Sequence, residues 1–183
     1  MTVRLLRDFD TILTSASKSA MIELFRTLKR YSNSLVLVGG WVPYFLLKES
    51  MARKGVEHVG SIDIDVVINP AEIGDDEYRT IVESICDVGW RPVEGKTFSY
   101  ERSVQSIDGG KRDITVDFLA PESKDSGRRH RHRAVQTDLK ARTMRGAEIA
   151  LTHNTNCNYS ASCTAASRRC LRIPHSVRRS HPS

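Results

Sequence analysis

The chain of 183 residues has the length of one ordinary domain, since single domains commonly contain roughly 100–200 residues. Its 39% hydrophobic and 27% charged residues are typical of a globular protein, and no apolar run approaches the ~20 residues that cross a bilayer. Charged and apolar residues alternate over the first ten positions, without the long apolar core of a secretory signal, so we expect a cytoplasmic protein.

The positive charge is unevenly distributed. The net charge is +6, but residues 1–151 contain 23 basic and 22 acidic residues, whereas residues 152–183 contain five arginines and no acidic residue. A nearly neutral body argues against nucleic-acid binding through overall charge alone. Three of the four cysteines also follow position 152, which excludes a disulfide framework for the body.

The N-terminal segment, residues 1–33, is predicted to form a helix that packs on the core. Apolar residues recur at three- and four-residue spacing from position 21 to position 31, and Ser17 or Ser19 can cap the start of the helix. The next segment, residues 34–151, is the predicted core of the domain.

The core begins with a predicted strand, a glycine pair and a helix. The apolar run 35–38 is typical of a buried strand, and it ends at Gly39 and Gly40. Pro43 suits the first turn of a helix that residues 44–52 continue, because its missing N–H has no partner there anyway.

A second strand, a third helix and a hairpin follow. Residues 62–68 alternate β-branched residues with two aspartates, which predicts a strand. Asp75 or Asp76 can cap the third helix. Two further strands, 97–104 and 112–119, flank an Asp-Gly-Gly turn that is typical of a hairpin. This order predicts an α/β (α+β) fold, a small mixed sheet flanked by helices.

The last third of the chain has a different character. Residues 122–133 are polar and basic and predict a mobile loop, and residues 136–151 are predicted to form one last helix. The Ser, Arg, Asn and Thr of residues 152–183 bury too little apolar surface to offset the ordering entropy, so we expect a disordered C-terminal tail. Its abrupt change in composition is also typical of a truncated gene or a shifted reading frame.

Two carboxylates lie on one face of the second predicted strand. Because side chains alternate, Asp63 and Asp65 point away from the apolar face, roughly 6.8 Å apart along the strand. This spacing allows them to share divalent metal ions.

The last hairpin strand has the same polarity, with Asp113, Thr115 and Asp117 on one face. If the two strands are neighbours, one of its carboxylates lies across from Asp63 and Asp65 and completes a three-carboxylate site. Asp113 and Asp117 are roughly 13–14 Å apart, so only one of them can belong to it.

Gly39 and Gly40 stand between a strand and a helix, where backbone N–H groups can approach a phosphate without obstruction by a β-carbon. An anion-binding turn beside a carboxylate metal site is the minimum equipment for phosphoryl or nucleotidyl transfer.

The run Val36–Trp41, the helix after it and the run Ser61–Val67 resemble the strand-GG-helix-DxD signature of the nucleotidyltransferase superfamily of the polymerase-beta type. The glycine pair followed by Trp41 and the Asp-Ile-Asp strand are similar to the AbiEii-type toxin and aminoglycoside nucleotidyltransferase branches. The similarity covers about residues 34–121. Many members have Ser where this chain has Trp41.

The resemblance implies a nucleotidyltransferase fold and the transfer of a nucleoside monophosphate from a nucleoside triphosphate. It implies that Asp63, Asp65 and Asp117 bind Mg²⁺ or Mn²⁺, with Asp117 as third carboxylate or acceptor base, and that Gly39, Gly40 and Ser61 lie on the phosphate side. The acceptor is left open among RNA such as tRNA, a protein side chain and a small hydroxylated molecule.

Several alternatives remain. The protein could be an inactive remnant, or a toxin–antitoxin component that binds nucleotide or a cognate antitoxin. The two aspartates could belong to a solvated strand face, to a haloacid dehalogenase-like phosphatase or to a metal-dependent glycosyltransferase. The basic cluster 128–133 is typical of a solvated loop; it could contact RNA, but it lacks the interleaved aromatic residues that stack bases.

Overall fold

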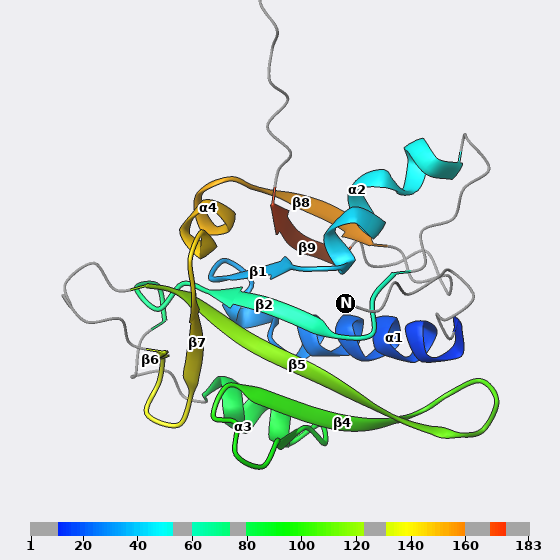
Figure 1. The fold of residues 1–183 in the computed structure, drawn as a ribbon, viewed down its shortest axis with the longest axis horizontal. Coiled ribbons are helices and arrows are strands. Elements are labelled where there is room, and N and C mark those ends of the chain that lie inside the picture. Colours follow the sequence, from blue (N-terminus) through cyan, green and yellow to red (C-terminus); the bar gives the residue numbers. More distant parts are fainter. Residues whose placement is uncertain (1–10, 53–59, 74–79, 123–130, 160–168, 175–183) are drawn as a thin grey trace, which may run out of the picture.

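The computed structural model describes residues 11–52, 60–73, 80–122, 131–159 and 169–174 (Figure 1). The first half contains, in order, α1 (Thr11–Thr27), the 3-10 helix η2 (Lys29–Tyr31), β1 (Leu35–Val38), α2 (Trp41–Ala52), β2 (Ile64–Ile68) and α3 (Ile81–Cys86). The second half contains β3 (Arg91–Pro92), β4 (Ser99–Gln105), β5 (Lys111–Pro121), β6 (His132–Ala134), β7 (Lys140–Met144), α4 (Ala147–Thr152), β8 (Asn154–Tyr159) and β9 (Arg169–Pro174). None of the helices described is long and apolar enough to cross a membrane.

A mixed seven-stranded sheet forms the centre of the molecule. Its main strand order is β1-β2-β5-β4-β3, with β1 antiparallel to β2, β2 parallel to β5, and β4 antiparallel to β5. β5 is the longest strand and has two partners along one of its edges. β4 pairs with its first part, and β7 pairs in parallel with its last three residues. The expected mixed sheet flanked by helices is therefore confirmed.

The two faces of the sheet contribute to two apolar clusters. The larger cluster contains buried side chains of α1 and α3 together with alternate residues of the strands, such as Ile64, Val66 and Phe118. The smaller one lies under α4 and contains Val67, Leu119 and other residues of the opposite face. A polar side chain on the same face of the sheet as Val67 and Leu119 therefore lies on the side covered by α4, which we call the α4 face.

The local predictions for the first part of the core agree with the structure in most respects. The strand over residues 35–38 is confirmed, and the helix after the glycine pair begins at Trp41. The second strand begins at Ile64, so the predicted start at residue 62 is two residues too early. The hairpin of β4 and β5 is confirmed.

The third helix begins later than its nearest acidic caps suggested. Thr80 accepts a hydrogen bond from Glu83 N, and the Glu83 side chain accepts one from Thr80 N, which together form a capping box. The predicted caps Asp75 and Asp76 lie outside the described residues.

The prediction of one helix over residues 136–151 is wrong. Leu139 and Ala141 are buried whereas Lys140 and Arg142 are exposed, and this two-residue alternation belongs to a strand, β7. Only residues 147–152 are helical. Pairing with β5 and β6 outweighs the local helical pattern, because it provides β7 with backbone partners on both edges. Residues 132 and 133, predicted as the end of a mobile loop, belong to the strand β6.

The prediction of a disordered tail is wrong for residues 154–159 and 169–174, which pair as the antiparallel strands β8 and β9. Strand pairing satisfies the backbone hydrogen bonds of even polar segments. Ile173 of β9 is completely buried in the larger cluster, and Cys157 of β8 packs against that cluster. Ile173 and Cys157 thus join to the core a segment whose composition shows no apolar periodicity.

Candidate functional site

Asp65 of β2 and Asp117 of β5 lie side by side on neighbouring parallel strands. They are register partners, and Asp65 is also the partner of Val38 at the end of β1. Because neighbouring strands are about 4.8 Å apart and register partners share a face, both carboxylates lie on the α4 face. Of the two candidates on β5, the structure brings Asp117 to this position and not Asp113, which pairs with Ser103 of β4.

Asp63 lies next to this pair but outside the strand. It is exposed and precedes β2, and its carboxylate accepts a hydrogen bond from Thr115 Oγ1 at 3.1 Å. Thr115 is two residues before Asp117 on the same face of β5, so its hydrogen bond holds Asp63 on the same side of the sheet as Asp65 and Asp117. Asp113 is hydrogen-bonded to Ser103, further along the hairpin.

The carboxylates repel one another electrostatically. Burial raises the pKa of Asp65, and the charges of Asp117 and then of Asp63 raise it further, while the Arg142 guanidinium lowers it. Ser99, which is almost completely buried, donates a hydrogen bond to Asp117 Oδ1 at 2.6 Å. A cation placed between these carboxylates would relieve the repulsion, which is the chemistry of a metal-binding site.

The glycine pair forms the wall of the site on the β1 side. Gly39 has a φ of +71°, and a β-carbon on it would lie 2.3 Å from Asp65 Oδ2. A β-carbon on Gly40 would lie 2.8 Å from the Ser61 hydroxyl, so the predicted phosphate-side residues Gly39, Gly40 and Ser61 do come together. α2 begins directly afterwards, and the amide groups of its first turn provide partial positive charge.

The donor set is suited to Mg²⁺ bound together with a substrate. Among the residues that the structure describes, no group of three or more His, Cys, Asp and Glu side chains is arranged as a complete metal site. Mg²⁺ is usually held by one or two carboxylates, with substrate phosphates and water as the other ligands. Asp65 and Asp117, beside the glycine turn at the start of α2, fit this arrangement. Asp63 is held nearby by its hydrogen bond from Thr115.

Three residues of the site were given no role by the sequence, although Thr115 was expected on the carboxylate-bearing face. Thr115 and Ser99 position Asp63 and Asp117, and their signal was their place in the predicted hairpin, on the carboxylate-bearing face of β5 and at the start of its partner strand. Arg142 had no such signal, because it lies in a segment predicted to be helical and reaches the site only through the pairing of β7 with β5.

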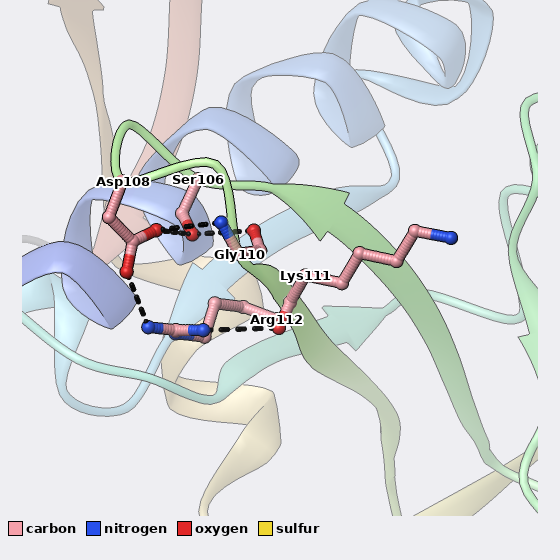
Figure 2. A network of polar contacts seen from close by, with 5 residues as sticks. All are labelled: Ser106, Asp108, Gly110, Lys111 and Arg112. Atoms are coloured by element: carbon pink, nitrogen blue, oxygen red, sulfur yellow. Dashed lines mark hydrogen bonds and ion pairs between the residues drawn. The ribbon is translucent and has the colours of Figure 1, made fainter.

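Two basic residues of the β4–β5 hairpin, Lys111 and Arg112, lie far from the site. Figure 2 shows the turn of the β4–β5 hairpin, where Arg112 forms an ion pair of 2.8 Å with Asp108. Asp108 also accepts hydrogen bonds from Ser106 and from the backbone N–H of Gly110, and these contacts together with the charge of Arg112 lower its pKa. Lys111 and Arg112 are five or six residues from Asp117 along β5, or roughly 17–20 Å. Arg112 therefore stabilises the turn instead of the site, and it also donates a hydrogen bond to the Lys111 carbonyl.

Comparisons of the chain with protein-family models, with curated proteins and with solved structures give no significant match.

Proposed function

We propose that the protein is a metal-dependent nucleotidyltransferase of the polymerase-beta type. The observation that carries the proposal is the register of Asp65 and Asp117 on adjacent strands, directly beside the Gly39–Gly40 turn. Two repelling carboxylates thus lie beside the glycine turn at the start of α2, and in this proposal the turn binds the phosphates. The proposal includes a cytoplasmic location.

The residues divide into two groups by their expected roles. Asp65 and Asp117 would hold Mg²⁺ or Mn²⁺, with Asp63 close enough to join them once a nucleotide is bound. The metal would neutralise charge on the transferred phosphoryl group. Gly39 and Gly40 allow the triphosphate to approach the backbone, and the Ser61 hydroxyl beside Gly40 can donate a hydrogen bond to it.

Binding of metal and phosphate is the first experiment, and Mg²⁺ with inorganic tripolyphosphate is the probe. Isothermal titration calorimetry should show binding to the wild type and none to Asp65→Asn, while Asp113→Asn, on the same strand face but outside the site, should bind normally. Equal binding by Asp65→Asn would overturn the assignment of the site.

Transfer itself is tested with nucleoside triphosphates labelled at the α-phosphate, offered with RNA, protein and small-molecule acceptor pools. The label should enter a macromolecule or a small hydroxylated compound in an Asp65-dependent manner. Metal-dependent nucleotide binding without any transfer would instead favour a silent nucleotide-binding protein or a toxin–antitoxin component.

A further inference from the structure

An aromatic pair lies next to the carboxylates on the side away from the glycine turn. Phe98 and His132 stack with ring centroids 5.5 Å apart and an interplanar angle of 25°. Phe98 directly precedes Ser99, the register partner of Asp117, and its carbonyl accepts a hydrogen bond from Phe118 N at 2.8 Å. The pair is therefore fixed to the strand that carries Asp117.

The strand register puts His132 on the carboxylate face. His132 pairs with Arg142, and Arg142 pairs with Leu119, which is two residues after Asp117 on β5. Register partners share a face and so do residues two apart, so Asp117, Arg142 and His132 all belong to the α4 face. His132 is exposed although it stacks on Phe98, and a ring held in place by such a contact loses little entropy when it binds a ligand.

Positive charge accompanies the aromatic pair. The Arg142 guanidinium lies 5.9 Å from the centroid of the Phe98 ring, and it is exposed and close enough to Asp65 to influence that carboxylate. Arg131, next in the chain to His132, is exposed as well. Aromatic faces interleaved with arginines are typical of surfaces that bind single-stranded nucleic acid, where bases stack and the cations contact phosphates.

The two sides of the site have different chemistry. Across the sheet, the glycine turn lies at the end of β1, the carboxylates lie on β2 and β5, and the aromatic pair lies beyond β5. In phosphoryl transfer the attacking and leaving oxygens are roughly in line on opposite sides of the phosphorus. If the leaving polyphosphate occupies the glycine turn, the acceptor approaches from the side of Phe98 and His132.

We propose that Phe98, His132 and Arg142 form the acceptor site, and that it binds the end of a single-stranded nucleic acid by stacking its base on His132. Phe98 positions the imidazole ring, and Arg142 contacts the phosphate that joins the terminal nucleotide to the strand. This inference rests on the proposed function for its acceptor role, but base stacking at this surface can be measured without metal or nucleotide.

The test is binding of a short fluorescent single-stranded oligonucleotide, followed by anisotropy, to the wild type, His132→Ala and His132→Phe. Loss of one stacked base should weaken binding of His132→Ala roughly 5- to 150-fold. His132→Phe keeps an aromatic face and should retain most of the affinity, which a purely electrostatic role of His132 would not allow. Affinity should fall less steeply with salt for Arg142→Ala. The slope of log affinity against log salt concentration should become less negative by about 0.7, the value for one phosphate contact on a single strand.

Two controls separate this inference from the proposed function. His132→Ala should bind Mg²⁺–tripolyphosphate as the wild type does, and Asp65→Asn should bind the oligonucleotide but not Mg²⁺–tripolyphosphate. Unchanged oligonucleotide binding by His132→Ala would overturn the acceptor site. The acceptor site would also be overturned if His132→Ala lost affinity for a nucleoside triphosphate but kept its affinity for tripolyphosphate and for the oligonucleotide. The stacked base would then belong to the donor nucleotide.

Discussion

Gly39 and Asp65 are packed so closely that a β-carbon at position 39 would lie 2.3 Å from the Asp65 carboxylate oxygen Oδ2. The turn after β1 and the carboxylate on β2 therefore cannot be changed independently. A side chain at position 39 would have to displace the carboxylate, or the strand end would have to move away from it.

Replacement of Gly39 by alanine should impair both stability and metal binding. The left-handed φ of +71° alone costs an alanine about 1–2 kcal/mol, and the contact with Asp65 adds to this cost. Gly109→Ala is the matched control, since Gly109 has a similar φ of +79° and a β-carbon added to it would meet no atom within 4 Å. Chemical denaturation should show a larger loss for Gly39→Ala, and only Gly39→Ala should bind Mg²⁺–tripolyphosphate more weakly. Equal effects of the two variants would mean that backbone strain is the whole cause.

Asp65→Asn should make the metal-free protein more stable at neutral pH. Burial and the charges of Asp117 and Asp63 raise the pKa of Asp65 in the folded state. A protonated Asp65 therefore favours folding, and this contribution to stability is lost as the pH rises through the folded pKa. An asparagine avoids that loss. A rise in Tm of about 2–4 °C would correspond to roughly 1 kcal/mol for a domain of this size.

The gain from Asp65→Asn should disappear in acid, below the pKa of the unfolded aspartate, where Asp65 is protonated in both states. Thermal denaturation in metal-free buffer at neutral and acidic pH checks both parts. A lower Tm for Asp65→Asn at neutral pH would contradict the electrostatic account of the site.

Ser99→Ala should weaken the site by removing the hydrogen bond that Asp117 accepts at 2.6 Å. A hydrogen bond to a charged group contributes about 1.5–3 kcal/mol, and the buried position of Ser99 allows water little access as a replacement donor. Ser103→Ala removes the equivalent contact with Asp113 at an exposed position of the same strand and should have a smaller effect. Urea denaturation and Mg²⁺–tripolyphosphate titration of both variants measure the difference, and matching results would remove Ser99 from the site.

The C-terminal hairpin should contribute substantially to stability through Ile173. Its side chain is fully buried, so Ile173→Ala should cost about 2–5 kcal/mol. Ile149→Ala is the control, because Ile149 is 60% exposed and its replacement should change the free energy of unfolding by about 0.5 kcal/mol or less. A negligible effect of Ile173→Ala would mean that β9 does not dock on the core in solution.

Sequence patterns predicted those parts of the fold that are determined locally. The apolar run before Gly39, the alternating strand around Asp65 and the hairpin turn each carry their own signal within a few residues. The placement of Asp117 across from Asp65 also followed from matching polarity, once the two strands were assumed to be neighbours. That prediction assumed that the strands of Asp65 and Asp117 are neighbours, and the pairing of β2 with β5 confirms the assumption.

The features that sequence reasoning missed all depend on contacts between distant segments. Arg142 reaches the site because β7 takes over from β4 as the partner of β5, and no local pattern encodes that change. The basic cluster 128–133 has no interleaved Phe, Tyr or Trp in the sequence. Its aromatic partner, Phe98, comes from a different part of the chain and stacks on His132 only in the folded protein. Ile173 lies in the polar segment that was predicted to be disordered, since its partners in the core belong to distant elements.

Ile173 and the apolar face of α1 belong to the same buried cluster, although they lie near opposite ends of the described chain. A chain that is synthesised from its N-terminus therefore exposes the apolar face of α1 long before Ile173 leaves the ribosome. Contacts of such large sequence separation also slow folding, because the intervening loop must close before they form. β9 cannot dock before Ile173 has left the ribosome, and until then the chain leaves apolar surface of this cluster open to chaperones.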